Sequence, residues 1–183
     1  MAYQETMNVI DYLSNQDNAL ELFGKTFSSE LISFHFDQPG WESGAIFIVM
    51  SKKEVQNTEQ ALMISVVQQF VRFGDFYFKD AAEIDIYNRC IEHLNEHYGN
   101  AKFELTEKIK LEDCIARFFS DSEQKIYENY RWEIQTSIDR IKEMAWANQP
   151  ACKAYHLKSE WNDEDYLFET NDYFIRYNWG TSA

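Results

Sequence analysis

The sequence predicts an α+β fold in which an antiparallel sheet, built from N-terminal and C-terminal strands, packs against a central set of helices. Segments rich in β-forming residues lie at 31–36 and 44–50, and such segments return after Pro150. Between them, apolar residues recur at steps of three and four, as they do on one face of a helix. The order strands, helices, strands is typical of α+β domains. A chain of 183 residues also fits a single globular domain, 1–183.

The N-terminal part is expected to form two short helices followed by a pair of strands. Apolar residues spaced about three apart predict the helices at residues 7–13 and 18–23. Residues 31–36 alternate apolar and polar side chains, and residues 44–50 are a dense run of β-formers. Pro39-Gly40 marks a turn between them, so we expect an antiparallel pair with a long connection.

The first central helices are predicted from their capping residues. Asn57 or Thr58 can cap a helix that ends at Gly74, because Asn and Thr side chains accept hydrogen bonds from the first free amides of a helix. Asp80 can cap the next helix, and Gly99 is a natural C-terminal stop for it.

The second half of the helical region is predicted to contain a short strand and a long helix. We expect the strand at residues 103–105 and a helical face over residues 111–118. The long helix is predicted to begin near Asp121 or Ser122 and to stop at Pro150. Its apolar seam consists of Tyr127, Tyr130, Ile134, Ile138, Ile141 and Ala145.

The C-terminal part returns to strand patterns. Residues 154–161 read as a strand, and residues 166–169 and 173–179 as a hairpin around Thr170-Asn171-Asp172. This stretch could join the sheet begun at residue 31, which would bring the two ends of the chain together. The pattern leaves open whether the strands form one sheet or two.

The net charge of −14, from 17 basic and 31 acidic residues, limits the classes of partner. Such a field repels nucleic-acid backbones and anionic lipid and attracts basic proteins. Solubility alone also favours an excess of acids. We expect a basic protein partner, with no direct nucleic-acid or membrane binding.

The cysteines favour a reducing compartment. Cys90, Cys114 and Cys152 are odd in number and far apart, and they form no C-x-x-C pair. The start of the chain lacks the basic residues and apolar run of a signal peptide. We therefore expect a cytoplasmic protein.

One motif suggests a metal site. His93, Glu96 and His97 match H-x-x-E-H, in which two histidines one helical turn apart bind zinc and the glutamate activates water. No third ligand is evident, and the histidines can equally flank an apolar stripe near a helix C-terminus. No glycine-rich phosphate loop or nucleophile elbow occurs. We expect no catalytic residues, no bound metal and no cofactor.

Two segments combine carboxylates with large aromatics, as protein-binding surfaces do. The first covers residues 160–172, where we expect residues 160–166 to form a loop, and the second covers residues 37–42. Their tryptophans could instead close the edge of the core, with the acids in solvent. The predicted partner-binding residues are Glu160, Trp161, Asp163, Glu164, Asp165, Glu169, Asp172 and Trp41.

The segment from Tyr166 to Ala183 resembles the closing hairpin of some small bacterial immunity proteins, which end in an aromatic strand and a Trp-Gly-Thr or similar tail. The resemblance covers about a tenth of the chain and implies a cognate toxin, neutralised by occlusion of its active site or by the holding of a domain that it needs. Three alternatives stay open. One is a nucleic-acid mimic from a mobile element, the second is a small zinc hydrolase that uses His93, Glu96 and His97, and the third is a scaffold or assembly component that oligomerises through its long helix.

Overall fold

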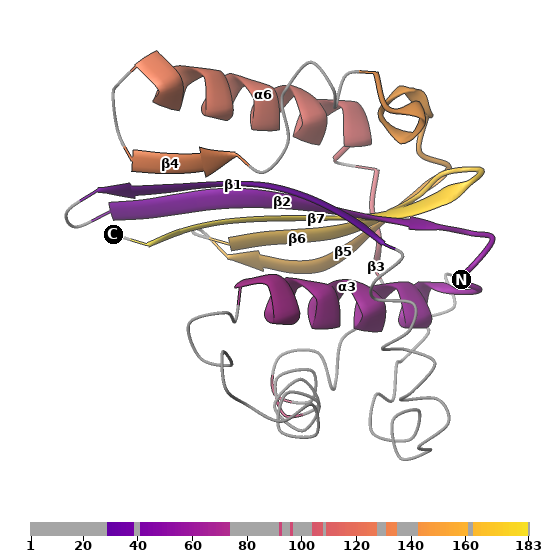
Figure 1. The fold of residues 1–183 in the computed structure, drawn as a ribbon. Helices are drawn as coiled ribbons and strands as arrows, with labels where there is room; N and C mark the ends of the chain where they lie inside the picture. Colours follow the sequence, from indigo (N-terminus) through magenta and orange to yellow (C-terminus); the bar gives the residue numbers. More distant parts are fainter. Residues whose placement is uncertain are drawn as a thin grey trace.

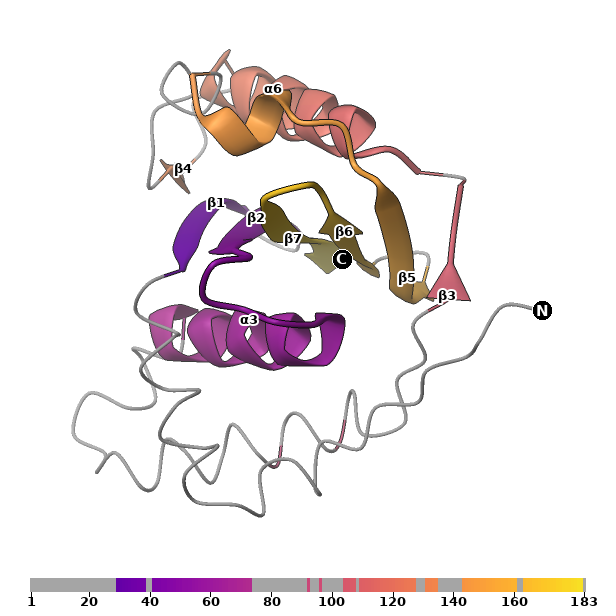
Figure 2. The same cartoon turned by 90° about the vertical axis from the view of Figure 1, so that its right-hand side faces the viewer.

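The computed structural model confirms the α+β fold. It describes residues 29–38, 41–73, 92, 96, 104–107, 109–127, 131–134, 143–160 and 163–182. Within these ranges seven strands form one sheet in the order β3-β5-β6-β7-β2-β1-β4, and every neighbouring pair is antiparallel. Helix α3 covers one face of the sheet and helix α6 the other (Figures 1 and 2).

The elements follow the chain in a simple order. They are β1 (Glu30–Gln38), β2 (Trp41–Ser51), α3 (Thr58–Phe73), β3 (Glu104–Leu105), α6 (Leu111–Tyr127), β4 (Arg131–Ile134), the 3₁₀ helix η1 (Ala145–Asn148), β5 (Lys153–Glu160), β6 (Asp163–Glu169) and β7 (Tyr173–Ser182).

The N-terminal and C-terminal strands join in a single sheet, which settles the question that the sequence pattern left open. β2 pairs with β7 along its whole length, from Glu42 opposite Ser182 to Ser51 opposite Tyr173. The connection between β1 and β2 is shorter than expected. Gln38 already pairs with Trp41, so only two residues separate the strands.

The hairpin of β6 and β7 is confirmed, with its turn where the sequence predicts it. The Thr170 amide donates to the Tyr173 carbonyl at 2.9 Å. The Tyr173 amide donates to Thr170 Oγ1 at 3.0 Å. Thr170 is fully buried, so its hydroxyl meets its hydrogen-bonding needs within the turn.

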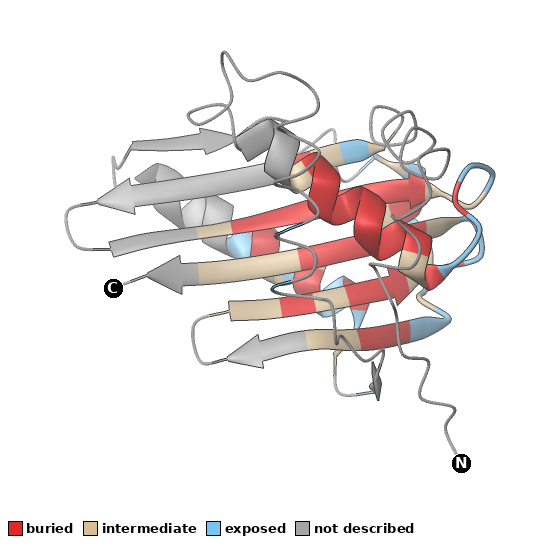
Figure 3. Ribbon diagram, turned by 90° about the horizontal axis from the view of Figure 1, so that it is seen from below, coloured by how far each residue is buried: buried red, intermediate tan, exposed pale blue. Residues whose placement is uncertain are grey.

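Helix α3 is capped by Asn57, as predicted. The Gln60 amide donates to Asn57 Oδ1 at 2.8 Å, which satisfies one of the free amides at the helix start. From Ala61 to Val67 every residue of α3 is buried, including the polar Ser65. Figure 3 shows this burial continuing onto the strands that α3 covers. A helix buried on all sides lies inside a protein rather than at its surface.

An aromatic cluster fills the opposite layer, between the sheet and α6. The ring of Phe47 lies 5.3 Å from Phe118, 5.5 Å from Trp146 and 4.9 Å from Tyr177, measured between centroids. Phe118 comes from α6 and Trp146 from η1, so this cluster fastens both to the sheet. Cys114 is buried in the same layer and acts there as a small apolar residue.

The prediction of one long helix that begins near Asp121 or Ser122 and stops at Pro150 is wrong. A single helix, α6, runs through residue 121 and ends at Tyr127. Arg131–Ile134 then forms β4, which pairs with Phe34–Asp37 of β1. The apolar residues of this segment predicted a helix because a short apolar segment can match both the helical period of about 3.6 residues and the strand period of two residues. The open edge of β1 gives these residues backbone partners that the sequence pattern does not show.

Several predicted elements lie outside the described residues. These are the helices at 7–13 and 18–23 and most of the helix at 80–99, of which Glu92 and Glu96 are described as helical and exposed. No helix in the described part of the chain has the length and apolar character needed to cross a membrane.

Candidate functional site

The sheet register brings the acidic segment that contains Trp41 and the first part of the segment at 160–172 to the same end of the sheet. Gly44 pairs with Gly180, and Gly180 in turn pairs with Asp163. Asp163 also pairs with Glu160 across the turn from β5 to β6. In Figure 1, the β1–β2 connection and the C-terminal end of β7 lie at this end of the sheet. We call it the hairpin end and define it by the backbone positions of Asp37, Trp41, Glu42, Glu160, Asp163 and Glu164.

The acidic segment at 160–166 is mostly strand, not the expected loop. Glu160 ends β5, and Asp163 begins β6. Trp161 lies in the connection, outside the described residues. Because side chains alternate along a strand, neighbouring carboxylates in β6 point to opposite faces of the sheet.

Glu164 points to the α6 face and is partly neutralised. Its Oε2 lies 2.7 Å from Nη1 of Arg117, which α6 supplies. Burial opposes the charge of Arg117, but the hydrogen bond to Glu164 and the electrostatic effects of Tyr177, Glu164 and Cys114 together outweigh it, so the pKa of the guanidinium lies above its usual value. Burial and the charge of Glu164 also raise the pKa of the neighbouring Tyr166 phenol. These contacts fix Glu164 in place while leaving it partly exposed.

Asp163 is likewise half-buried, and a hydrogen bond from Asn178 holds its carboxylate in place. Its Oδ1 accepts a hydrogen bond from Nδ2 of Asn178 at 3.1 Å. The same Asn178 amide lies 3.3 Å from the Glu164 carbonyl. A carboxylate held by a neighbouring strand loses less side-chain freedom on meeting a partner.

Asp165 does not lie on the accessible surface. Its side chain is fully buried against Arg176, whose Nε donates to Oδ1 at 2.9 Å and whose Nη2 donates to Oδ2 at 2.6 Å. Arg176 Nη1 donates to Gln69 of α3 at 2.8 Å. This bidentate pair is a buried structural contact, and the sequence signalled it only by placing Arg176 between apolar residues of β7.

Glu169 and Asp172 lie at the opposite end of β6 from the hairpin end. Six residue steps separate Glu169 from Asp163, which is about 20 Å along a strand. Asp172 Oδ2 accepts from Nε2 of Gln149 at 2.8 Å. The predicted binding residues therefore form two groups rather than one surface.

Two lysines surround Glu169. Its Oε1 lies 2.8 Å from Lys52 and its Oε2 3.4 Å from Lys153. Burial disfavours the charged carboxylate, but the hydrogen bond and charge of Lys52 and the charge of Lys153 outweigh it. The pKa of Glu169 therefore lies below its usual value.

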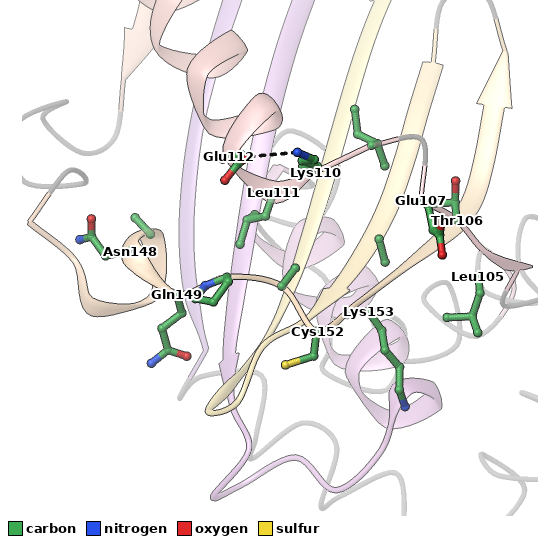
Figure 4. Close-up of a pocket in the computed structure, with 15 residues that line it drawn as sticks. Leu105, Thr106, Glu107, Lys110, Leu111, Glu112, Asn148, Gln149, Cys152 and Lys153 are labelled. Carbon is green, nitrogen blue, oxygen red and sulfur yellow. Dashed lines mark ion pairs between the residues drawn. The ribbon is translucent and has the colours of Figure 1, made fainter.

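A groove that the sequence did not predict lies beside this second group (Figure 4). One wall consists of residues 105–107 and 109–112 and the other of residues 147–154, and the volume of the groove is about 1010 Å³. Cys152 lines the groove and is exposed, and its Sγ lies 3.3 Å from Asn171 Oδ1. We call this the edge groove, since β3 is the edge strand of the sheet.

Neither metal ligands nor relatives identify a chemistry for the chain. Of the H-x-x-E-H motif, only the exposed Glu96 is described, and His93 and His97 lie outside the described residues. Within the described ranges no group of three or more His, Cys, Asp or Glu side chains could hold a metal ion. Comparisons with protein-family models, curated proteins and solved structures found no match.

Proposed function

We propose that this protein is an acidic inhibitor that binds a basic protein partner, and that the partner is a cognate bacterial toxin domain which it occludes. One observation carries the proposal. The sheet register gathers the acidic segment that contains Trp41 and the first part of the segment at 160–172, more than a hundred residues apart in sequence, at the hairpin end. Aromatic anchors among carboxylates are typical of surfaces that recognise Lys-rich and Arg-rich proteins.

The charge balance at the hairpin end supports a basic partner. Acidic residues stand at positions 37, 42, 160, 163 and 164, and Arg131 is paired in register with Asp37. Arg117 offsets Glu164. The remaining excess of acid adds to the chain's net charge of −14, which speeds the approach of a basic protein.

The resemblance of residues 166–183 to the closing hairpin of bacterial immunity proteins favours a toxin as that partner. Many such toxins are basic nucleases, and an acidic inhibitor gains both attraction and fast association with them. Release of the partner by added DNA would indicate that this protein covers a nucleic-acid groove, as a nucleic-acid mimic does.

Affinity capture from the source organism's lysate tests the proposal. The tagged protein is the bait at low and at high salt, and an unrelated acidic protein of similar size and charge is the control. We expect one basic protein, recovered in near-equal amount, specific to this bait and weakened by salt. The purified partner should then lose its toxic activity on addition of this protein. Recovery of the same proteins by both baits would contradict the proposal.

A further inference from the structure

The edge groove lies between two segments of the chain. One wall, at residues 105–107 and 109–112, includes the start of α6, and the other, at residues 147–154, runs from the end of η1 into β5. A backbone hydrogen bond joins them, from the Thr106 amide to the Ala154 carbonyl at 2.9 Å. The volume of about 1010 Å³ is enough for several side chains of a peptide.

The groove carries an exposed apolar residue at its edge. Leu105 is 59% exposed, and it is the one large apolar side chain among the described residues that is classed as exposed. Ile109 and Ala151 contribute further partly buried apolar surface to the lining. An exposed apolar side chain beside a groove is a typical anchor point for a partner.

The charges around the groove favour a basic occupant. Glu107, Glu112 and Asp113 are all exposed on or beside one wall. Lys110 is 3.6 Å from Glu112, so those two charges offset each other. Glu107 and Asp113 make no ion pair with any residue that the structure describes. On the other wall, Lys153 is 3.4 Å from Glu169, and the same carboxylate lies 2.8 Å from Lys52, so among the described residues four carboxylates face three lysines around the groove.

We propose that the edge groove binds an extended segment of a basic partner, which places an apolar side chain against Leu105 and lysines or arginines beside Glu107 and Asp113. The identity of that partner rests on the proposed function, whereas the chemistry of the segment rests on the groove. A second copy of this chain is a poor occupant, since each copy carries a net charge of −14.

Cys152 allows a direct test, because its exposed thiol lines the groove. Short peptides that end in an activated disulfide are equilibrated with the protein in a thiol buffer, and capture is read by intact mass. The protein carries Cys90→Ser. Cys114 does not interfere, since burial raises the pKa of its thiol to about 12 and a buried thiol is inert. Three peptides are compared: an apolar centre flanked by lysines, the same centre flanked by glutamates, and a serine centre flanked by lysines.

We expect that about tenfold more reductant is needed to release the lysine-flanked apolar peptide from Cys152 than to release either of the other two peptides. Leu105→Ser should remove the advantage of the apolar centre. The matched control carries Cys152→Ser and Glu30→Cys, which moves the thiol to an exposed site on β1, five strand positions from β3 in the sheet order. Equal capture of all three peptides at Cys152, or the same preference at position 30, would overturn the proposal. The assay needs no natural partner, so its failure is distinct from a failed capture from lysate.

Discussion

At the residue scale, the carboxylates of β6 show how far position alone can change the role of an acid. Glu164 is partly exposed beside Arg117, whereas Asp165 is buried against Arg176. The sequence identified both residues as acids in one segment, but it could not assign them to opposite faces because the segment was expected to be a loop. Once residues 163–169 are known to be a strand, the alternation follows.

The buried pair gives a stability prediction. Asp165→Ala leaves the guanidinium of Arg176 buried without its carboxylate, so we expect a loss of about 3–5 kcal/mol in the free energy of unfolding. The double variant Asp165→Leu with Arg176→Met should lose much less, because it removes both charges. Urea unfolding measures all three proteins. A single variant as stable as the wild type would show that the pair does not support the core.

Glu169 gives a pH prediction. Its pKa lies below the ordinary value of 4.5, so the folded state favours the charged carboxylate. The resulting stabilisation is complete above that ordinary value and is lost as the pH falls through the lower folded pKa. At neutral pH, Glu169→Gln should therefore unfold more easily by about 0.5–1 kcal/mol.

The difference between Glu169→Gln and the wild type should shrink as urea unfolding is repeated at successively more acidic pH. Glu54→Gln is the matched control, because the Glu54 side chain is exposed. A difference for Glu169→Gln that stays constant on acidification would count against the ion pairs with Lys52 and Lys153.

At the scale of elements, the sequence predicted the parts with strong local signals. The alternation of apolar and polar residues at 31–36 predicted β1, and the turn at residues 170–172 predicted the hairpin of β6 and β7. The prediction failed over residues 131–134, because β4 depends on its pairing with β1 rather than on its own residues. The edge groove could not be predicted from the sequence either, because its two walls are far apart in sequence and come together only in the folded chain.

The cap of α3 offers a test of one such local signal. Asn57→Ala removes the acceptor of the Gln60 amide, and we expect a loss of about 1 kcal/mol in the free energy of unfolding. Asn57→Ser keeps a capping oxygen and should stay close to the wild type. Thermal or urea unfolding distinguishes the two variants. Equal losses for both would mean that the Asn57 side chain contributes something other than the cap.

At the scale of the whole molecule, the topology explains how distant segments come to share a surface. β2 and β7 lie at the centre of the sheet, so the N-terminal and C-terminal acids meet at the hairpin end. The acidic composition of the sequence predicted a basic partner. The sequence could not predict which acidic residues lie together, because that depends on how the strands pair.

The association rate with the captured partner is the most direct test of the hairpin end. Glu42→Lys with Glu160→Lys reverses two charges there, and Glu30→Lys with Glu54→Lys makes the same change at two exposed positions near the opposite end of the sheet. The first pair should slow association about tenfold at low salt, and the control pair should slow it far less. If both pairs slow association equally, or neither does, the hairpin end is not the surface that meets the partner.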